Sequence, residues 1–337
     1  MLRGSELLAD EGTQNVTLQA VEGVAVALVF VMGLIFGSFL NVVIARVPMG
    51  ESVVHPRSRC PRCGHQLAWY ENIPVLSWIA LRARCSSCGL PISWRYPLIE
   101  LLTGLLFLAC QRRFGWSPEL VSGLVLVLLL VPLSFIDLEH WILPHELTWP
   151  GIAAGVVLSA TQGLDRLRDS VIGAVAGFLI FWAMEWIGEK IFKKEALGAG
   201  DKDLLALLGA FLSWKALLGI IFLSSLQGAV VGSLMLLIHG RAGPAPEPEA
   251  SEPPPATPPS PQVAPEGEPG AAPEAVGAEH AQAEKGEGEE EDDWVPGPTN
   301  IPFGPWLSLA ALEIMLLGPW LSEVLPVPLD LLLSGVR

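Results

Sequence analysis

Two aspartates stand where long apolar segments end or begin. Asp137 follows the apolar run Leu124–Ile136, and Asp201 closes the tetrapeptide Gly198-Ala199-Gly200-Asp201 just before another apolar run. Two adjacent carboxylates cannot both ionise easily, so such a pair shares one proton. The charged member can take a proton from water as the water attacks a peptide carbonyl, while the protonated member donates to the carbonyl oxygen. If the fold brings Asp137 and Asp201 together, they can hydrolyse a peptide bond without a metal.

Each aspartate also has a plainer explanation. Aspartate often caps a helix, and the glycine-rich turn before Asp201 fits a simple helix N-cap. Neither Asp137 nor Asp201 therefore indicates catalysis by itself. The absence of side chains at Gly198 and Gly200 would let a peptide backbone approach Asp201, which favours the catalytic interpretation. The sequence has no H-E-x-x-H segment and no G-x-S-x-G segment, so those two hydrolase mechanisms are not predicted.

Four cysteines form a second motif with a chemical use. Cys60-Pro-Arg-Cys63 and Cys85-Ser-Ser-Cys88 are C-x2-C pairs, each followed by glycine, and 21 residues separate them. Four thiolates at this spacing predict a closed, tetrahedral, structural zinc site. Two disulfides or four free thiols are the alternatives, and a reducing cytoplasmic location would disfavour the disulfides. The fifth cysteine, Cys110, lies in an apolar block and is predicted to be a packing residue.

The segments that must position these residues are membrane helices. Apolar residues make up 51% of the 337-residue chain and charged residues only 16%. The apolar residues are concentrated in blocks of about 20, the length at which an α-helix crosses a bilayer. We predict an all-α polytopic membrane protein with about eight transmembrane helices and a small cytoplasmic zinc-binding loop domain. The predicted spans are 21–45, 97–111, 119–136, 147–161, 171–188, 203–213, 216–238 and 301–321.

The block 203–213 is short for a full crossing. It fits a tilted short span, a re-entrant turn, or the first part of a longer helix that is broken near Ser213-Trp214-Lys215.

Positive charge gives the predicted orientation. The loop 46–96 has seven arginines and the loop 189–202 has four lysines, so we place both in the cytoplasm and the short N-terminal segment 1–20 outside. Two predicted spans separate the arginine-rich loop from Asp137, and two more separate Asp137 from Asp201. Both aspartates should therefore face the cytoplasm. They belong to a membrane domain over 97–240, and residues 300–337 form the last transmembrane helix and the C-terminus.

Residues 241–299 differ in composition from the rest of the chain. The whole chain has a net charge of −15, and this segment alone holds 14 acidic and two basic residues together with 14 of the 29 prolines. Low hydrophobicity, high charge and abundant proline are typical of disorder. We predict a disordered, acidic, proline-rich cytoplasmic insertion between two spans.

These motifs together resemble the bacterial prepilin peptidase family, also called type IV leader peptidases, which are intramembrane aspartyl proteases of the GxGD type. Asp137 and Asp201 fall on the family's two catalytic aspartates, with Gly198 and Gly200 in the second motif. The resemblance covers residues 24–321 apart from the acidic insertion. The other matching segments are Gly37–Val43 with Arg46–Pro48, Glu71–Pro74 between the cysteine pairs, Arg95–Glu100, and Ile301–Pro305 before the last span.

The resemblance implies an activity, partners and a location. Members of this family cut the short basic leader from type IV prepilins or type II secretion pseudopilins at the cytoplasmic face of the bacterial inner membrane. Many then methylate the new N-terminal residue with S-adenosylmethionine. The cysteine-bearing loop is associated with these bifunctional members, so methylation is implied here too, with no residue assigned to the methyl donor. The expected partners are pilin-like substrates and the bilayer, not nucleic acid, and no oligomeric state is assigned.

Two positions near the aspartates depart from the family pattern. The family usually has Leu-Pro-Asp after its first catalytic aspartate, where this chain has Leu143-Pro144-His145. It usually has lysine two residues after its second, where Asp203 stands here. His145 and Glu146 are predicted mainly as loop residues, and Glu185 as a polar residue that faces the helix bundle.

Two other classes of protein remain open on the sequence. A proton-coupled transporter would also place carboxylates in a helical bundle, but near the bilayer midplane and without a metal-binding loop. A membrane-anchored assembly factor would bind partners through its zinc loop, and its aspartates would be helix caps. Leader removal from a prepilin distinguishes a peptidase from both.

Overall fold

The described part of the protein is largely α-helical. The computed structural model describes residues 2–192, 198, 200–239 and 301–324, and the predicted insertion 241–299 lies outside them. The chain divides into two parts, residues 1–231 with 302–337, and residues 232–301. The helices are α1 (Leu2–Arg46), η1 (Val47–Met49), η2 (Trp69–Asn72), α2 (Leu76–Ala80), α3 (Arg95–Phe114), α4 (Pro118–His140), α5 (His145–Thr161), α6 (Leu164–Phe192), α7 (Asp201–Leu212), α8 (Trp214–His239) and α9 (Gly304–Val324).

Several helices carry the apolar surface of a membrane protein. Large apolar side chains are exposed along α1, α6 and α8, among them Leu28, Val175 and Leu218. Lipid would cover such a surface, whereas water would disfavour it. Four segments are long and apolar enough to cross a membrane, and a shorter apolar helix occupies Gly304–Gly318. The four are Val21–Met49, Pro118–His140, Leu164–Ile191 and Trp214–Ile238.

The all-helical class is confirmed, and each of the eight predicted blocks overlaps a helix. The count of about eight membrane crossings stays a prediction, because the helices of the other blocks are shorter or less apolar than the four above.

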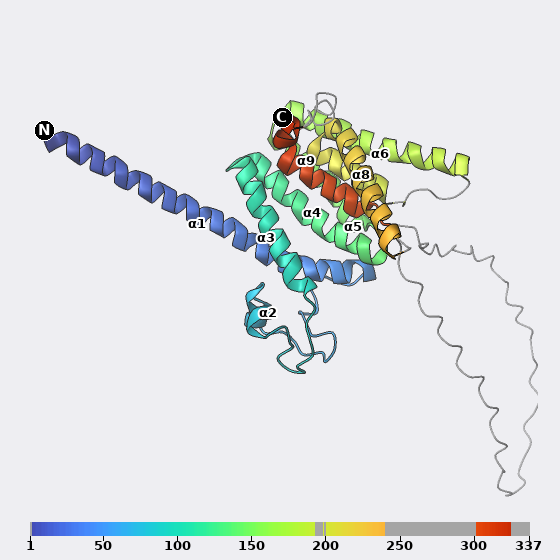
Figure 1. Cartoon of the computed structure of the whole chain (residues 1–337), viewed down its shortest axis with the longest axis horizontal. Helices are drawn as coiled ribbons and strands as arrows, with labels where there is room; N and C mark the ends of the chain where they lie inside the picture. The colour runs from blue at the N-terminus through green and yellow to red at the C-terminus, as the bar shows by residue number, and fades with distance from the viewer. Residues whose placement is uncertain (1, 193–197, 199, 240–300, 325–337) are drawn as a thin grey trace, which may run out of the picture. The chain divides into compact units, whose positions relative to one another are not determined.

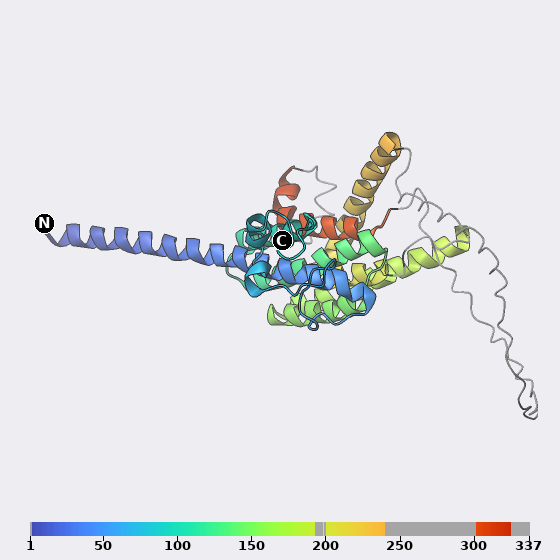
Figure 2. The same ribbon diagram turned by 90° about the horizontal axis from the view of Figure 1, so that it is seen from below.

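α1 is longer than predicted at its N-terminal end. The helix begins at Leu2, so the segment 1–20 is helical from residue 2 onward rather than a separate tail. Figures 1 and 2 show this half of α1 running beyond the end of α3, and the other half running beside α3.

Glycines let α1 and α3 approach closely. A Cβ atom built on Gly37 would lie 2.6 Å from the Cα atom of Glu100, so no larger residue fits there. Small residues at such a crossing are the usual means of packing membrane helices. The buried Asn41 side chain, one turn further along α1, donates a hydrogen bond to the carbonyl of Tyr96 at 3.2 Å. The first-helix signature therefore fixes α1 against the start of α3.

α7 is a short helix enclosed by its neighbours. Its 12 residues extend about 18 Å, less than the roughly 30 Å of hydrocarbon in a bilayer. It packs against α5, α6 and α9, and 11 of its residues are buried. The backbones of α6 and α7 touch at Gly173 and Gly209, where a Cβ on either glycine would meet the carbonyl of the other.

Ser213, with a φ of 75°, separates α7 from α8. A break near Ser213 is therefore present, and how the block 203–213 lies in the membrane stays a prediction.

The segment between α1 and α3 forms a small lobe of coil and short helices (Figure 1). Within it, two isolated β-bridges pair Arg59 with Gln66 and Arg84 with Pro91. The lobe is fastened to α3 by a buried contact in which the Val75 amide donates to the Glu100 carboxylate at 2.7 Å.

Candidate active site

The structure brings Asp137 and Asp201 together at helix ends. Asp137 lies in the last turn of α4, and Asp201 is the first residue of α7. Each is only 6% exposed. Gly304, whose amide contacts Asp137, and Gly200, which precedes Asp201, both lie against Leu143, so the two aspartates belong to one packed region. Their action as a catalytic pair stays a prediction.

A third helix contributes to the site through its backbone. The amide of Gly304, the first residue of α9, donates a hydrogen bond to Oδ2 of Asp137 at 3.0 Å. The first amides of a helix have no partner within the helix and are suited to bind a carboxylate. The sequence pointed to Ile301–Pro305 as a family signature but gave Gly304 no role. The signal available in the sequence was a glycine between two nearby prolines, Pro302 and Pro305, at the start of the last apolar block.

The glycines around the pair are required by close packing. A Cβ atom on Gly200 would lie 2.6 Å from Cβ of Leu143, and one on Gly198 would lie 3.3 Å from Oδ2 of Asp201. Leu143 also lies against Gly304, where a Cβ atom would be 3.4 Å from its Cδ2. Leu143 therefore packs between the starts of α7 and α9, and the predicted glycines leave room for it.

Gly304→Ala should impair the site without unfolding the protein. The added methyl group would lie 2.5 Å from Oδ2 of Asp137, so the carboxylate must move away from the helix start. Loss of a charge-assisted hydrogen bond in a buried site predicts a fall in catalytic rate of about tenfold or more. A kinetic assay beside a thermal unfolding curve in detergent checks this. Gly123→Ala on α4, where the new Cβ would have 3.2 Å of space to Phe114, is the control; equal loss in both variants would contradict a specific role.

Ion pairs surround the two aspartates. Glu139, two residues after Asp137, pairs with Arg95 at 2.7 Å, and Lys202 pairs with Glu185 of α6 at 2.9 Å. Glu185 faces the bundle, as predicted. His145 and Glu146 were predicted mainly as loop residues, and that prediction is wrong. They are the first two residues of α5, because the carbonyl of Pro144 accepts the amides of Leu147 and Thr148 and so starts the helix.

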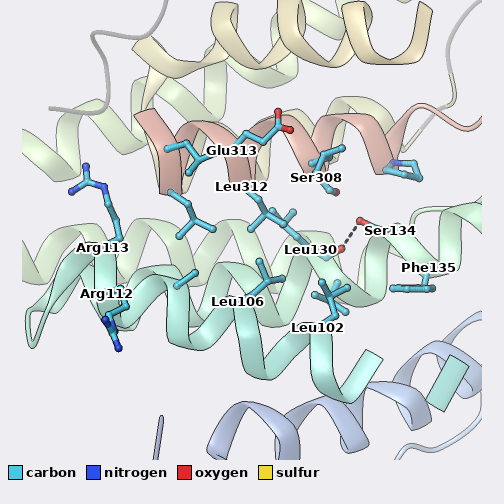
Figure 3. A pocket seen from close by; sticks show the side chains of 16 residues that line it. Leu102, Leu106, Arg112, Arg113, Leu130, Ser134, Phe135, Ser308, Leu312 and Glu313 are labelled. Atoms are coloured by element: carbon cyan, nitrogen blue, oxygen red, sulfur yellow. Dashed lines mark hydrogen bonds between the residues drawn. The ribbon is translucent and has the colours of Figure 1, made fainter. Parts of the chain in front are cut away.

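A cavity of about 660 Å³ lies between α3, α4 and α9 (Figure 3). Its walls are mostly apolar side chains, with Arg112 and Arg113 at one end and Ser134 and Phe135 at the other. Ser134 and Phe135 lie within one helical turn of Asp137. The Ser308 hydroxyl, which lines the cavity, has no hydrogen-bond partner in the described part of the chain. The cavity therefore offers an apolar surface with a polar group available, and neither Asp137 nor Asp201 lines it.

The four cysteines predicted as metal ligands form one cluster in the lobe. The sulfur atoms of Cys60, Cys63, Cys85 and Cys88 lie within 4.8 Å of one another. Those of Cys63 and Cys85 are 3.9 Å apart. Zinc–sulfur bonds of about 2.3 Å in a tetrahedron place the sulfurs about 3.8 Å apart, so the cluster fits a zinc ion. All four thiols are free rather than paired in disulfides, and Cys110 is buried in the core as predicted.

The two cysteine pairs have the same local structure. The Cys60 amide donates to the His65 carbonyl and the Cys85 amide to the Leu90 carbonyl, and the glycine after each pair has a positive φ. Backbone amides of Cys63 and Arg62 lower the pKa of the Cys60 thiol to about 7. The amides of Cys88 and Ser87 likewise lower the pKa of Cys85. The first cysteine of each turn is therefore favoured as the thiolate, the form that binds metal, whereas the pKa of Cys88 is raised to about 11.

Glu71 links the two cysteine turns. Hydrogen bonds from the Ser86 hydroxyl and the Ala68 amide hold the pKa of this buried carboxylate below its usual range, and His65 adds a contact at 3.3 Å. Ser86 belongs to one cysteine turn and His65 follows the other. The sequence quoted Glu71 only as part of a family motif, and the structure gives it this joining role.

Fold and site together define a class: a helical membrane protein with a buried pair of carboxylates at helix ends and a four-cysteine lobe. The chain belongs to the type IV leader peptidase family. Residues 124–233 match that family's model, and residues 31–114 match the model of the bacterial peptidase A24 N-terminal domain.

Relatives cover most of the chain. It is 59% identical to the prepilin leader peptidase/N-methyltransferase of Myxococcus xanthus, across 91% of this chain and 94% of that protein. It is 41% identical to the protein of the same name from Aeromonas hydrophila, across 65% and 85% of the two chains. The identity to the one from Stutzerimonas stutzeri is 38%, across 61% and 79%. No solved structure matches the chain.

Proposed function

We propose that this protein is a prepilin leader peptidase and N-methyltransferase whose peptidase residues are Asp137 and Asp201. Its substrates are type IV prepilins or type II secretion pseudopilins. The observation that carries the peptidase assignment is the burial of these two carboxylates at the end of α4 and the start of α7, which both pack around Leu143. Family membership and the names of the relatives support the reaction class.

Hydrolysis uses the single proton that the pair holds. The ionised aspartate takes a proton from water, and the water oxygen forms a bond to the scissile carbonyl carbon as the protonated aspartate donates to the carbonyl oxygen. Collapse of the tetrahedral intermediate breaks the C–N bond, and the leaving amine takes its proton from the aspartate that received one from water. The other aspartate takes back a proton from a hydroxyl of the intermediate as the carbonyl re-forms, so the pair again holds one proton. The Gly304 amide holds the Asp137 carboxylate in place during this exchange.

A zinc ion would be held by Cys60, Cys63, Cys85 and Cys88. Four protein ligands leave no open position, so its role is structural. It would join the two halves of a lobe that has little regular secondary structure. S-adenosylmethionine supplies the methyl group in the second reaction, and we assign no residue to its binding.

The protein would sit in the bacterial inner membrane with the aspartate pair and the cysteine lobe at the cytoplasmic face. The seven arginines of the loop 46–96 and the lysines of the loop 189–202 support this orientation. A transporter would need acidic groups near the bilayer midplane, whereas both aspartates lie at helix ends.

The proposal is tested with the purified protein in lipid nanodiscs, a prepilin substrate and S-adenosylmethionine. Mass spectrometry should show loss of the leader and then a gain of one methyl group at the new N-terminus. Omission of S-adenosylmethionine should leave cleavage intact and remove methylation. An intact prepilin after prolonged incubation would contradict the proposal and leave the transporter or assembly-factor classes.

A further inference from the structure

The two positions at which the sequence departs from the family pattern touch each other. Nδ1 of His145 lies 3.0 Å from Oδ2 of Asp203. The side chain of His145 is 61% exposed and that of Asp203 only 8%. A nearly buried carboxylate therefore has one partner that reaches it from the protein surface.

The contact joins the two segments that carry the aspartate pair. His145 begins α5 and is linked through the turn 141–144 to α4, which ends just after Asp137. Asp203 lies in the first turn of α7, two residues after Asp201. The His145–Asp203 contact thus links the segment that follows Asp137 to α7, which begins with Asp201.

Charge explains why the two positions depend on each other. A buried carboxylate without a compensating partner is strongly unfavourable. Next to Asp203 in the sequence, Lys202 is engaged with Glu185 of α6. The ring of Trp149 lies 5.4 Å from the His145 ring and holds it on this side. The imidazole is then the group positioned to neutralise Asp203.

We propose that His145 and Asp203 form a positioning pair that fixes Asp201 relative to Asp137. The inference rests on the proposed function of those two aspartates. Neither residue of the pair takes part in proton transfer. Losing the contact lets the first turn of α7 shift, which separates the carboxylates and lowers kcat more than it changes KM.

An exchange of charges tests this pair. His145→Asp places a second carboxylate against Asp203, and Asp203→Lys places a cation against His145, so each should lower kcat for leader cleavage about tenfold or more. The double variant restores opposite charges and should recover to within about threefold of the unmodified enzyme. Glu146→Gln removes an exposed charge next to His145 and should leave kcat unchanged. Zinc content and thermal unfolding of each variant are measured in parallel.

Recovery in the double variant is a result that damage to packing alone would not give. The proposal would be overturned if the single variants had unaltered kcat. It would also be overturned if the kcat of the double variant fell by the product of the two single losses or more. If the charge variants accumulate poorly, His145→Ala serves instead, because its largely exposed side chain can be removed without a large cavity. Unaltered kcat in His145→Ala would overturn the inference equally. An unmodified enzyme that fails to cleave would instead count against the proposed function.

Discussion

Replacing either Asp137 or Asp201 with asparagine is expected to abolish leader cleavage while the protein remains folded in the membrane. Asparagine has nearly the shape of aspartate but can neither accept nor release the catalytic proton. General acid–base groups commonly contribute about a hundredfold to ten-thousandfold, so we expect a loss of at least about a thousandfold in kcat. Because both side chains are buried, a neutral amide should not weaken the fold through desolvation of charge.

The measurement is the fraction of prepilin cleaved over time, with membrane abundance as the check on folding. The double variant should be no worse than each single variant, since the two groups act as one unit. Glu139→Gln is the matched control, because Glu139 is on the same helix but is partly exposed and paired with Arg95. Near-normal cleavage by either asparagine variant would remove that aspartate from the mechanism.

Loss of the metal is the second large effect we expect. Cys60→Ser should release about one zinc ion per chain and loosen the lobe between α1 and α3. A serine hydroxyl is not a soft thiolate ligand, and three remaining thiolates leave the tetrahedral site open. Since the binding of a structural metal ion is part of the folding free energy, the lobe should become sensitive to proteases. Metal analysis and limited proteolysis of the purified protein check both effects.

Cys110→Ser is the control for the cysteine substitution. Cys110 is buried on α3, away from the four-cysteine cluster, so its replacement should leave the zinc content unchanged. Unmodified protein that contains no zinc would contradict the metal assignment. Mass shifts after alkylation would then show whether the four thiols are free or paired in disulfides.

Short sequence patterns predicted some features of the structure and missed others. The G-x-G-D segment predicted room for a peptide backbone near Asp201, whereas in the structure the Leu143 side chain of the protein itself lies against Gly200. The length of the apolar blocks predicted helices, since backbone groups in lipid must satisfy one another within each helix. The same pattern missed the true start of α1 at Leu2, because polar residues of the segment 2–20 continue a helix without adding hydropathy.

The sequence by itself was enough to predict a membrane protein and the clustering of the four cysteines. It also singled out Asp137 and Asp201 as the candidate catalytic residues. Each of these depends on residue type and short spacing, which local chain geometry translates directly into structure. Only the tertiary structure decided which groups meet at the site. Gly304 donates to Asp137 across 167 residues of chain, and His145 reaches Asp203 from a different helix. Contacts of this kind follow from how helices pack against one another, and no local pattern encodes that packing.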